Sequence, residues 1–252
     1  MKVYRIKTKA GISHAVLGSD DVFELVETDF ETVKHQAIYV PAHDAEILAP
    51  CTPSKVVAVG LNYRQHAAEL NMALPAEPLI FIKPATTVIA VDEAIVYPKQ
   101  SMRVDYEAEL AVVIKKTCKH VTADEAADYI AGYTCLNDVT ARDLQKRDGQ
   151  WTRAKGFDTF CPIGPFIETD FDWRGKQITG KLNGKVVQQS STDDLIFGVE
   201  DIIAHISGVM TLNAGDVIAT GTPSGIGPML PGDVVSVEIE GLGALKNTVV
   251  QQ

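Results

Sequence analysis

The sequence has few of the features that direct a protein to a membrane, to nucleic acid or to an oxidising compartment. Its four cysteines are scattered and form no Cys-x-x-Cys pair, and the chain starts Met-Lys-Val-Tyr-Arg-Ile, without the apolar core of a signal peptide. No stretch approaches the roughly 20 apolar residues of a transmembrane helix. The formal charge is −10 without a clustered basic patch, which argues against nucleic acid or an anionic membrane as a partner. We therefore expect free thiols and a soluble, cytoplasmic protein.

The chain divides into a small first part and a large second part. Short apolar runs predict strands at 3–6, 14–17 and 22–26, and residues 33–39 are too few to assign. Two prolines within residues 47–54 indicate a joint. We predict a small N-terminal β-rich domain at residues 1–50 and a catalytic domain at residues 51–252.

Strands dominate the second part as well, which favours an α+β fold that is mostly β. Strands are expected at 55–60, 78–84, 104–114, 133–138, 177–182, 185–189 and from 215 and 232 onward. Asn183-Gly184 predicts a hairpin turn. Helices are expected at 61–72, with Asn62 as N-cap, at 122–130, ended by Gly132, and at 140–147 and 199–208. Residues 150–165 have the composition of an ordered loop.

A pair of glutamates lies in the most apolar of these strands. In the segment Val104–Ile114, Glu107 and Glu109 are two residues apart and share one face of the strand. Two neighbouring carboxylates at the entrance to a core are costly to bury unless a cation lies between them. Either the pair points to solvent, or it binds a hard divalent cation such as Mg²⁺ or Mn²⁺.

Asp138 lies at the end of the strand predicted at 133–138. With the two glutamates it would make an all-oxygen partial shell that leaves room for water and substrate, which is how enzymes usually hold Mg²⁺. Arg142 offers a planar fork for a substrate carboxylate, and Lys155 on the loop offers a compact cation. The alternative is a non-catalytic module that holds Ca²⁺ for structure alone.

His66 and Glu69 are three residues apart in a helical segment, so they share a face and can hydrogen-bond. A histidine held by a carboxylate is a common general base, although the same spacing also describes an ordinary surface pair. Farther along, the glycine-rich stretch Gly221–Gly227 can bring Thr222 and backbone N–H groups close to a ligand. It lacks the Gly-Lys-Ser/Thr of a phosphate loop, which argues against a nucleotide site.

Six segments, in order, resemble the fumarylacetoacetate hydrolase family. They are Val59-Gly-Leu-Asn-Tyr-Arg-Gln-His66, Phe81-Ile-Lys-Pro84, Asp105-Tyr-Glu-Ala-Glu-Leu110, Asn137-Asp-Val-Thr-Ala-Arg-Asp-Leu-Gln145, Gly149-Gln-Trp-Thr-Arg-Ala-Lys-Gly-Phe-Asp158 and Ala219-Thr-Gly-Thr-Pro-Ser-Gly225. The resemblance runs from about residue 52 to the end. It is closest to the small bacterial members: acylpyruvate hydrolases, oxaloacetate decarboxylases and the isomerase/decarboxylase of homoprotocatechuate breakdown.

The resemblance implies a mixed β-sandwich roll, a homodimer and a bound Mg²⁺ or Mn²⁺, for which Ca²⁺ can substitute in a crystal. It implies that Glu107, Glu109 and Asp138 are the metal ligands. The implied catalytic residues are His66, Glu69 and Lys155, and the implied substrate contacts are Arg142, Gln145 and Thr222. The further carboxylate that larger family hydrolases place upstream of the histidine motif has no clear counterpart.

The function that follows is metal-dependent enolate chemistry on a small 2-oxo (di)carboxylic acid. We expect C–C bond cleavage, either hydrolysis of an acylpyruvate or fumarylpyruvate or decarboxylation of oxaloacetate. The alternative is isomerisation of 2-hydroxyhepta-2,4-diene-1,7-dioate or decarboxylation of 5-carboxymethyl-2-oxohex-3-ene-1,7-dioate. One electron sink serves all of these reactions, so the metal ligands do not select among them.

Overall fold

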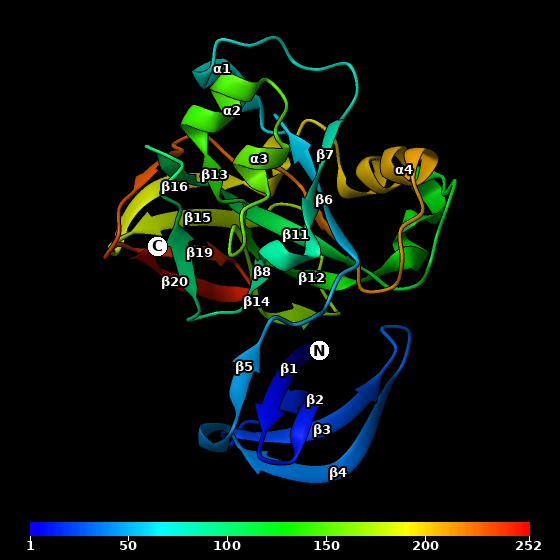
Figure 1. Ribbon diagram of the computed structural model, residues 1–252. Helices are drawn as coiled ribbons and strands as arrows, with labels where there is room; N and C mark the ends of the chain where they lie inside the picture. Colours follow the sequence, from blue (N-terminus) through cyan, green and yellow to red (C-terminus); the bar gives the residue numbers. More distant parts are fainter.

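Three β-sheets form the framework of the computed structural model, which describes residues 1–252 (Figure 1). The largest sheet has twelve strands, with the main order β4-β3-β2-β1-β14-β12-β11-β17-β6-β7. The second sheet has five strands, in the order β16-β15-β19-β20-β9, and the third has three, β13-β10-β18. The expected α+β, mostly β class is confirmed.

The strands that form these sheets run along the chain as follows. The first half contains β1 (Lys2–Thr8), β2 (Gly11–Leu17), β3 (Val22–Thr28), β4 (Val33–Pro41), β5 (Glu46–Leu48), β6 (Lys55–Gly60), β7 (Leu79–Pro84), β8 (Val88–Ile89), β9 (Ala94–Tyr97), β10 (Val104–Tyr106) and β11 (Ala108–Ile114). The second half contains β12 (Ile130–Asn137), β13 (Thr140–Ala141), β14 (Cys161–Glu168), β15 (Gln177–Leu182), β16 (Lys185–Ser191), β17 (Val217–Ala219), β18 (Gly227–Met229), β19 (Val234–Ile239) and β20 (Gly243–Gln251).

Helices are few and short. The α-helices are α1 (Arg64–Glu69), α2 (Arg142–Asp148), α3 (Thr152–Lys155) and α4 (Val199–Val209). The 3-10 helices are η1 (Ala42–Asp44), η2 (Ala85–Thr87), η3 (Ala123–Tyr129) and η4 (Thr192–Asp194). None of them is long and apolar enough to cross a membrane. Helices α1, α2 and α3 gather at one end of the molecule, at the top of Figure 1.

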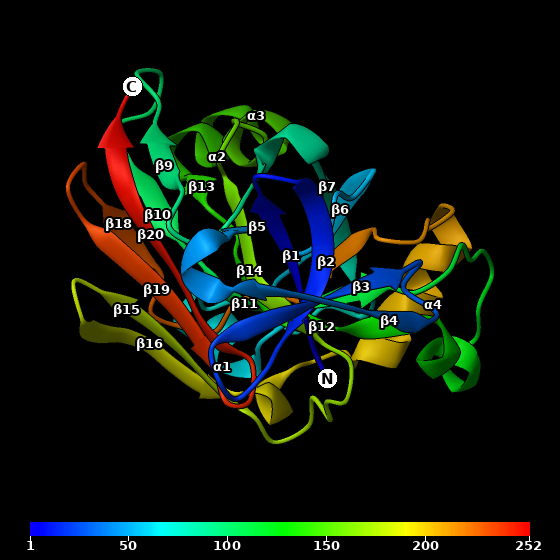
Figure 2. The same cartoon turned by 90° about the horizontal axis from the view of Figure 1, so that it is seen from below.

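Strands β1–β5 form a lobe at the opposite end, drawn in blue in Figure 1 and turned toward the viewer in Figure 2. The lobe is joined to the main body by backbone pairing, because β1 pairs with β14 at Lys2 and Val3. A small apolar cluster fills it, and Phe166 of β14 belongs to that cluster. The segment left unassigned from sequence is strand β4. A domain boundary at residue 50 stays a prediction.

The main core lies between the large sheet and the five-stranded sheet. All seven residues of β11 are buried, and the strand pairs with β12 on one side and β17 on the other. Its Leu110, Val112 and Ile114 belong to a cluster of 25 buried residues that also contains side chains of α4 and of β15, β19 and β20. The position of the glutamates beside β11 is therefore fixed by the best-packed part of the protein.

Several predicted elements differ from those observed. The strand predicted at 104–114 is interrupted at Glu107, because the Glu107 N–H donates to the Asn137 side-chain oxygen at 3.0 Å instead of to a neighbouring strand. The helix expected at 61–72 is only α1. Gly132 lies inside β12, where an added Cβ would come 2.4 Å from the Glu168 carbonyl oxygen. The predicted loop at 150–165 contains α3 and the start of β14.

Asn62 is not the N-cap of α1. Tyr63 occupies that position and makes no side-chain cap. The Asn62 amide instead donates to the carbonyl oxygens of Thr220 and Phe197, at 2.8 and 3.1 Å, and accepts from the Phe197 N–H at 2.9 Å. Gly221 (φ +103°) passes so close that a Cβ there would lie 2.7 Å from the Asn62 Cβ. The segment that carries α1 is thereby attached to the 220s loop.

The buried carboxylate of Asp216, just before β17, joins the start of that strand to the start of β6. Asp216 accepts hydrogen bonds from Ser54 Oγ at 2.6 Å, from Ser54 N at 2.9 Å and from Asn213 N at 2.8 Å, and it pairs with Lys55. Burial alone would raise the pKa of Asp216, but the Lys55 and Ser54 hydrogen bonds outweigh burial and lower it. The ionised form therefore stabilises the fold.

We predict that Asp216→Asn lowers the free energy of unfolding by about 3 kcal/mol at pH 7, because the Lys55 ammonium loses its buried partner. Since folding depresses the pKa of Asp216, its contribution is complete above the unfolded value of about 3.9 and is lost as the pH falls through the folded value. The difference between variant and wild type should therefore shrink below about pH 4. Urea unfolding at several pH values measures it, with exposed Asp20→Asn as control. Equal stability of Asp216→Asn and wild type at pH 7 would contradict the assignment.

Candidate functional site

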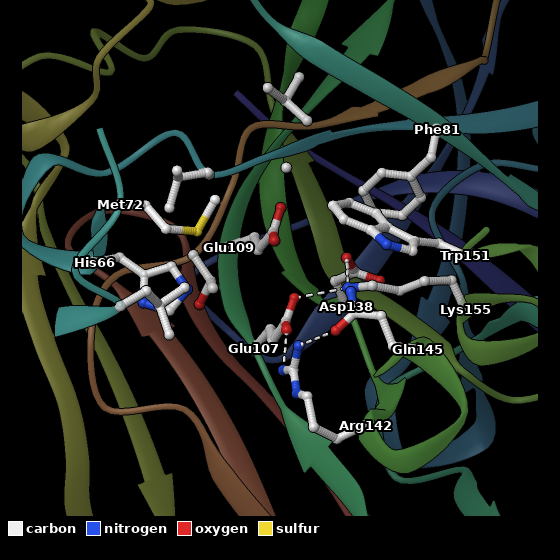
Figure 3. Close-up of a pocket in the computed structure, with 15 residues that line it drawn as sticks. His66, Met72, Phe81, Glu107, Glu109, Asp138, Arg142, Gln145, Trp151 and Lys155 are labelled. Carbon is white, nitrogen blue, oxygen red and sulfur yellow. Dashed lines mark hydrogen bonds and ion pairs between the residues drawn. The ribbon is translucent and has the colours of Figure 1, made fainter. Parts of the chain in front are cut away.

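A cavity lies between the carboxylates beside β11 and helices α1–α3 (Figure 3). Its polar side consists of Glu107, Glu109, Asp138, Arg142, Gln145, Lys155 and Thr222. The other residues that line it are His66, Gly60 and six apolar side chains: Val59, Leu61, Leu70, Met72, Phe81 and Trp151. All nine residues that the sequence proposes for the site are thus within one region, and only Glu69 does not line the cavity itself.

The three predicted metal ligands meet although they come from different parts of the chain. Glu107 lies between β10 and β11, Glu109 is on β11, and Asp138 follows β12. All three are buried, and one ligand atom from each lies within 4.8 Å of the others. Two ligands on opposite sides of a Mg²⁺ ion are about 4.2 Å apart, given metal–oxygen distances of about 2.1 Å. Neighbouring ligands are about 3.0 Å apart, so the all-oxygen donor set fits a hard divalent cation once the three carboxylates draw together around it.

Three basic side chains surround two of these carboxylates. Lys155 Nζ donates to Glu107 Oε2 at 2.8 Å and to Asp138 Oδ2 at 2.5 Å, and the fully buried Lys83 donates to Asp138 Oδ1 at 2.5 Å. Arg142 Nη2 donates to Glu107 Oε1 (Figure 3). Burial would raise the pKa of Glu107, but Lys155 and Arg142 outweigh it and hold the pKa at about 2. Burial likewise opposes the charge of Lys155, and Asp138 and Glu107 raise its pKa nonetheless.

Glu109 has no such cation. One of its oxygens accepts from the Gly221 N–H at 2.8 Å, and its other oxygen has no hydrogen-bond partner in the protein. Burial, followed by the charges of Asp138 and Glu107, raises the pKa of Glu109 well above its usual range. A buried carboxylate that is destabilised in its charged form is the feature that a bound cation would relieve.

His66 and Glu69 make the predicted hydrogen bond. His66 Nδ1 lies 2.8 Å from Glu69 Oε2, and His66 Nε2 has no protein partner while its ring faces the cavity (Figure 3). Glu69 also accepts from the Gly225 N–H at 3.1 Å, which attaches the end of α1 to the glycine-rich stretch 221–227. The ring is therefore oriented from behind, and the nitrogen that faces the cavity is free to exchange a proton.

The predicted substrate contacts differ in what they can offer. Arg142 Nη1 donates to Gln145 Oε1 at 2.6 Å, so the two residues act as a pair on α2. Thr222 lies in the cavity wall, but its hydroxyl donates to the Ala108 carbonyl oxygen at 2.9 Å and accepts from Gln188 Nε2 at 2.9 Å. Thr222 is thus positioned to accept a hydrogen bond from a ligand and has no proton left to donate.

Four residues at the site carry no functional assignment from the sequence. Lys83 and Asp105 are fully buried, and each pairs with a residue that lines the cavity. Phe81 and Trp151 form an aromatic wall, with ring centroids 5.1 Å apart at 75°. The sequence did contain a signal for Asp105. It precedes Glu107 and Glu109 at the two-residue spacing that places side chains on one face of a strand.

Comparison with known proteins identifies the family of the chain. The profile of the family described as "Fumarylacetoacetate (FAA) hydrolase C-terminal" matches residues 55–250. The chain is 45% identical over 224 residues to the human mitochondrial oxaloacetate tautomerase, a match that covers 84% of this chain and 71% of that protein. The chain therefore belongs to the fumarylacetoacetate hydrolase family.

Solved structures that share this fold include two named as isomerases. That of 5-carboxymethyl-2-hydroxymuconate delta-isomerase from Mycobacterium smegmatis is 43% identical, with a TM-score of 0.94 and full coverage of both chains. That of 2-hydroxyhepta-2,4-diene-1,7-dioate isomerase from Mycobacterium marinum is 44% identical, with a TM-score of 0.93 and coverage of 100% of this chain and 99% of that one. The expected family and its fold are confirmed.

The carboxylate cluster predicts how a single substitution changes metal binding. Glu109→Gln should weaken Mg²⁺ and Mn²⁺ binding at least about tenfold, because a charged ligand becomes neutral. Calorimetric titration of the metal-free protein measures the affinity, and exposed Glu31→Gln is the control. Unchanged affinity in Glu109→Gln would exclude Glu109 from the ligands.

Proposed function

We propose that this protein is a divalent-metal-dependent enzyme that interconverts the enol and keto forms of a 2-oxo dicarboxylic acid through an enolate. The observation that carries the proposal is His66, which lines the same cavity as the carboxylate cluster and whose Nε2 has no protein partner while Glu69 holds Nδ1. One base so placed can remove a proton and return it, which is all that a tautomerisation requires. The names of the human relative and of the two mycobacterial structures support this class of reaction.

The head of the substrate would bind beside the three carboxylates. Glu107, Glu109 and Asp138 would hold Mg²⁺ or Mn²⁺, which when bound supplies Lewis-acid polarisation of the 2-oxo group. Arg142, paired with Gln145, offers N–H donors to the substrate carboxylate. Phe81 and Trp151 offer an apolar wall to the rest of the substrate.

The proton transfer is assigned to His66 and the stabilisation of charge to Lys155. His66 Nε2 accepts the proton from C3 of the keto form, and the electron pair of the C–H bond becomes the enolate, with its charge on the 2-oxygen. Glu69 stabilises the imidazolium through Nδ1. Lys155, which is already held against Glu107 and Asp138, places an ammonium beside the developing oxyanion. Return of the proton to carbon or to oxygen completes the reaction without another reactant.

C–C bond cleavage, the reaction expected from the sequence, is the second candidate and stays a prediction. The family profile carries a hydrolase name, and the same His66 nitrogen could take a proton from water instead of from carbon. Decarboxylation would use the same enolate without water. The proposed homodimer and cytoplasmic location also stay predictions.

Turnover should depend on His66 far more than on another histidine. We predict that His66→Ala lowers kcat for oxaloacetate tautomerisation by a factor of about 10² to 10⁴ while Mg²⁺ affinity is retained. Absorbance of the enol, followed after mixing with Mg²⁺-loaded protein, measures the rate, and His43→Ala, at an exposed site, is the control. Parallel loss of metal affinity and activity in His66→Ala would contradict the role of a base.

The reaction class can be decided with a small panel of substrates. We expect the Mg²⁺-loaded protein to catalyse exchange of the C3 protons of oxaloacetate with deuterium from solvent. Release of pyruvate should be slower than this exchange. Acetylpyruvate, fumarylpyruvate and a 2-oxohept-3-enedioate complete the panel, and NMR follows both exchange and cleavage. Cleavage as fast as exchange would favour the second candidate. No change in any of the four compounds would favour a non-catalytic metal-binding module.

A further inference from the structure

Asp105 is a fully buried carboxylate two residues before Glu107, the first of the proposed metal ligands, and the proposed chemistry does not use it. It lies on β10, which pairs with β13 so that Asp105 is opposite Thr140. The Arg142 backbone N–H donates to the Arg103 carbonyl oxygen at 2.8 Å, which fixes the start of α2 beside β10. Arg142 is therefore held beside β10 by its backbone as well as by its side-chain contact with Asp105.

Two arginines share the Asp105 carboxylate. From the outside, Arg103 donates through Nε at 2.8 Å and through Nη2 at 3.2 Å, and its side chain is 47% exposed. From the inside, Arg142 donates through Nε to Asp105 Oδ2 at 2.9 Å, and its side chain is only 12% exposed. Asp105 thus contacts the edge of the Arg142 guanidinium that is turned away from the cavity.

The Arg142 guanidinium keeps two N–H donors that no protein group uses. A guanidinium has five N–H donors in a fixed plane. In Arg142, Nε serves Asp105, one Nη1 hydrogen serves Gln145, and one Nη2 hydrogen serves Glu107. Two donors, one on each terminal nitrogen, remain for a ligand. Because the guanidinium is planar, fixing Nε fixes the direction of both.

We propose that Asp105 is a positioning residue that holds the Arg142 guanidinium so that its terminal N–H groups meet the carboxylate of the 2-oxo acid. This rests on the proposed function for the identity of the ligand. Asp105 touches no substrate and acts only through Arg142. Its loss therefore weakens binding of the carboxylate head more than it slows the proton transfer at His66.

The test compares ligand binding in variants of the Mg²⁺-loaded protein. Oxalate is a suitable probe, since it carries the adjacent carboxylate oxygens that mimic a 2-oxo acid head and needs no turnover. Asp105→Asn should weaken oxalate binding, measured by calorimetry at saturating Mg²⁺, about ten- to hundredfold, as outer-shell positioning substitutions do. Arg103→Met is the matched control, because it removes the other ion pair of Asp105, and it should change the affinity less than about twofold.

A double-mutant cycle separates positioning from general stability. If Asp105 acts through Arg142 alone, the double variant of Asp105→Asn with Arg142→Gln binds oxalate as weakly as Arg142→Gln and no more weakly. Additive losses would overturn the proposal, as would wild-type affinity in Asp105→Asn. Asp105→Glu keeps the charge but moves the carboxylate by one methylene, so it serves if Asp105→Asn does not fold, and it should also weaken binding.

If the wild-type protein converts a 2-oxo acid, the values of KM and kcat give a second test of the role of Asp105. Asp105→Asn should raise KM for the 2-oxo acid by the same factor as the loss of oxalate affinity, with kcat within about threefold of wild type. A loss confined to kcat would contradict a positioning role. If the wild type binds oxalate but converts no 2-oxo acid, the proposed function fails, and the oxalate affinities still decide the role of Asp105.

Discussion

The mutual repulsion of Glu107, Glu109 and Asp138 is the constraint around which the structure is organised. Their ligand atoms lie within 4.8 Å of one another at the wholly buried strand β11. Two like charges about 5 Å apart repel by roughly 3 kcal/mol at an effective dielectric constant of 20. The fold tolerates this only because the cluster is compensated by Lys83, Lys155 and Arg142. Glu109 contacts none of these three cations. Its carboxylate is therefore the one whose negative charge is least compensated.

Part of this compensation comes from buried groups that do not line the cavity, whereas Lys155 and Arg142 do line it. Lys83 is fully buried on the far side of Asp138, and Asp105 holds Arg142 from the side opposite the cavity. The charges that stabilise the carboxylates are thus fixed by strand β7 and helices α2 and α3 before any ligand arrives. Preorganised charges of this kind are effective in catalysis, because they need no rearrangement when charge develops in the reaction.

Sequence periodicity predicts the parts of the site that are local. The two-residue repeat of strands places Glu107 and Glu109 side by side, and the three-residue spacing on a helix joins His66 to Glu69, and both were found. Periodicity says nothing about contacts between distant segments. Asn62 looks like a cap by its neighbours, but its partners are Phe197 and Thr220, more than 130 residues away. Helix α3 has only four residues, which is too short for a helical pattern to appear.

The two sides of the cavity come from different kinds of chain segment, which under the proposed function would separate binding of the substrate's carboxylate head from choice of the substrate. The carboxylates and their cations belong to paired strands and to the helices that follow them, which are held by the core. Most of the remaining wall comes from one continuous stretch, residues 59–81, which includes His66, Leu70, Met72 and Phe81. Leu70 and Met72 are largely exposed, so their replacement disturbs little packing. Substitutions in this stretch can therefore alter the position of His66 and the shape of the wall while the carboxylate cluster stays intact. Under the proposed function, that arrangement would let one family keep the same carboxylate centre and still contain enzymes named for hydrolysis, isomerisation and tautomerisation.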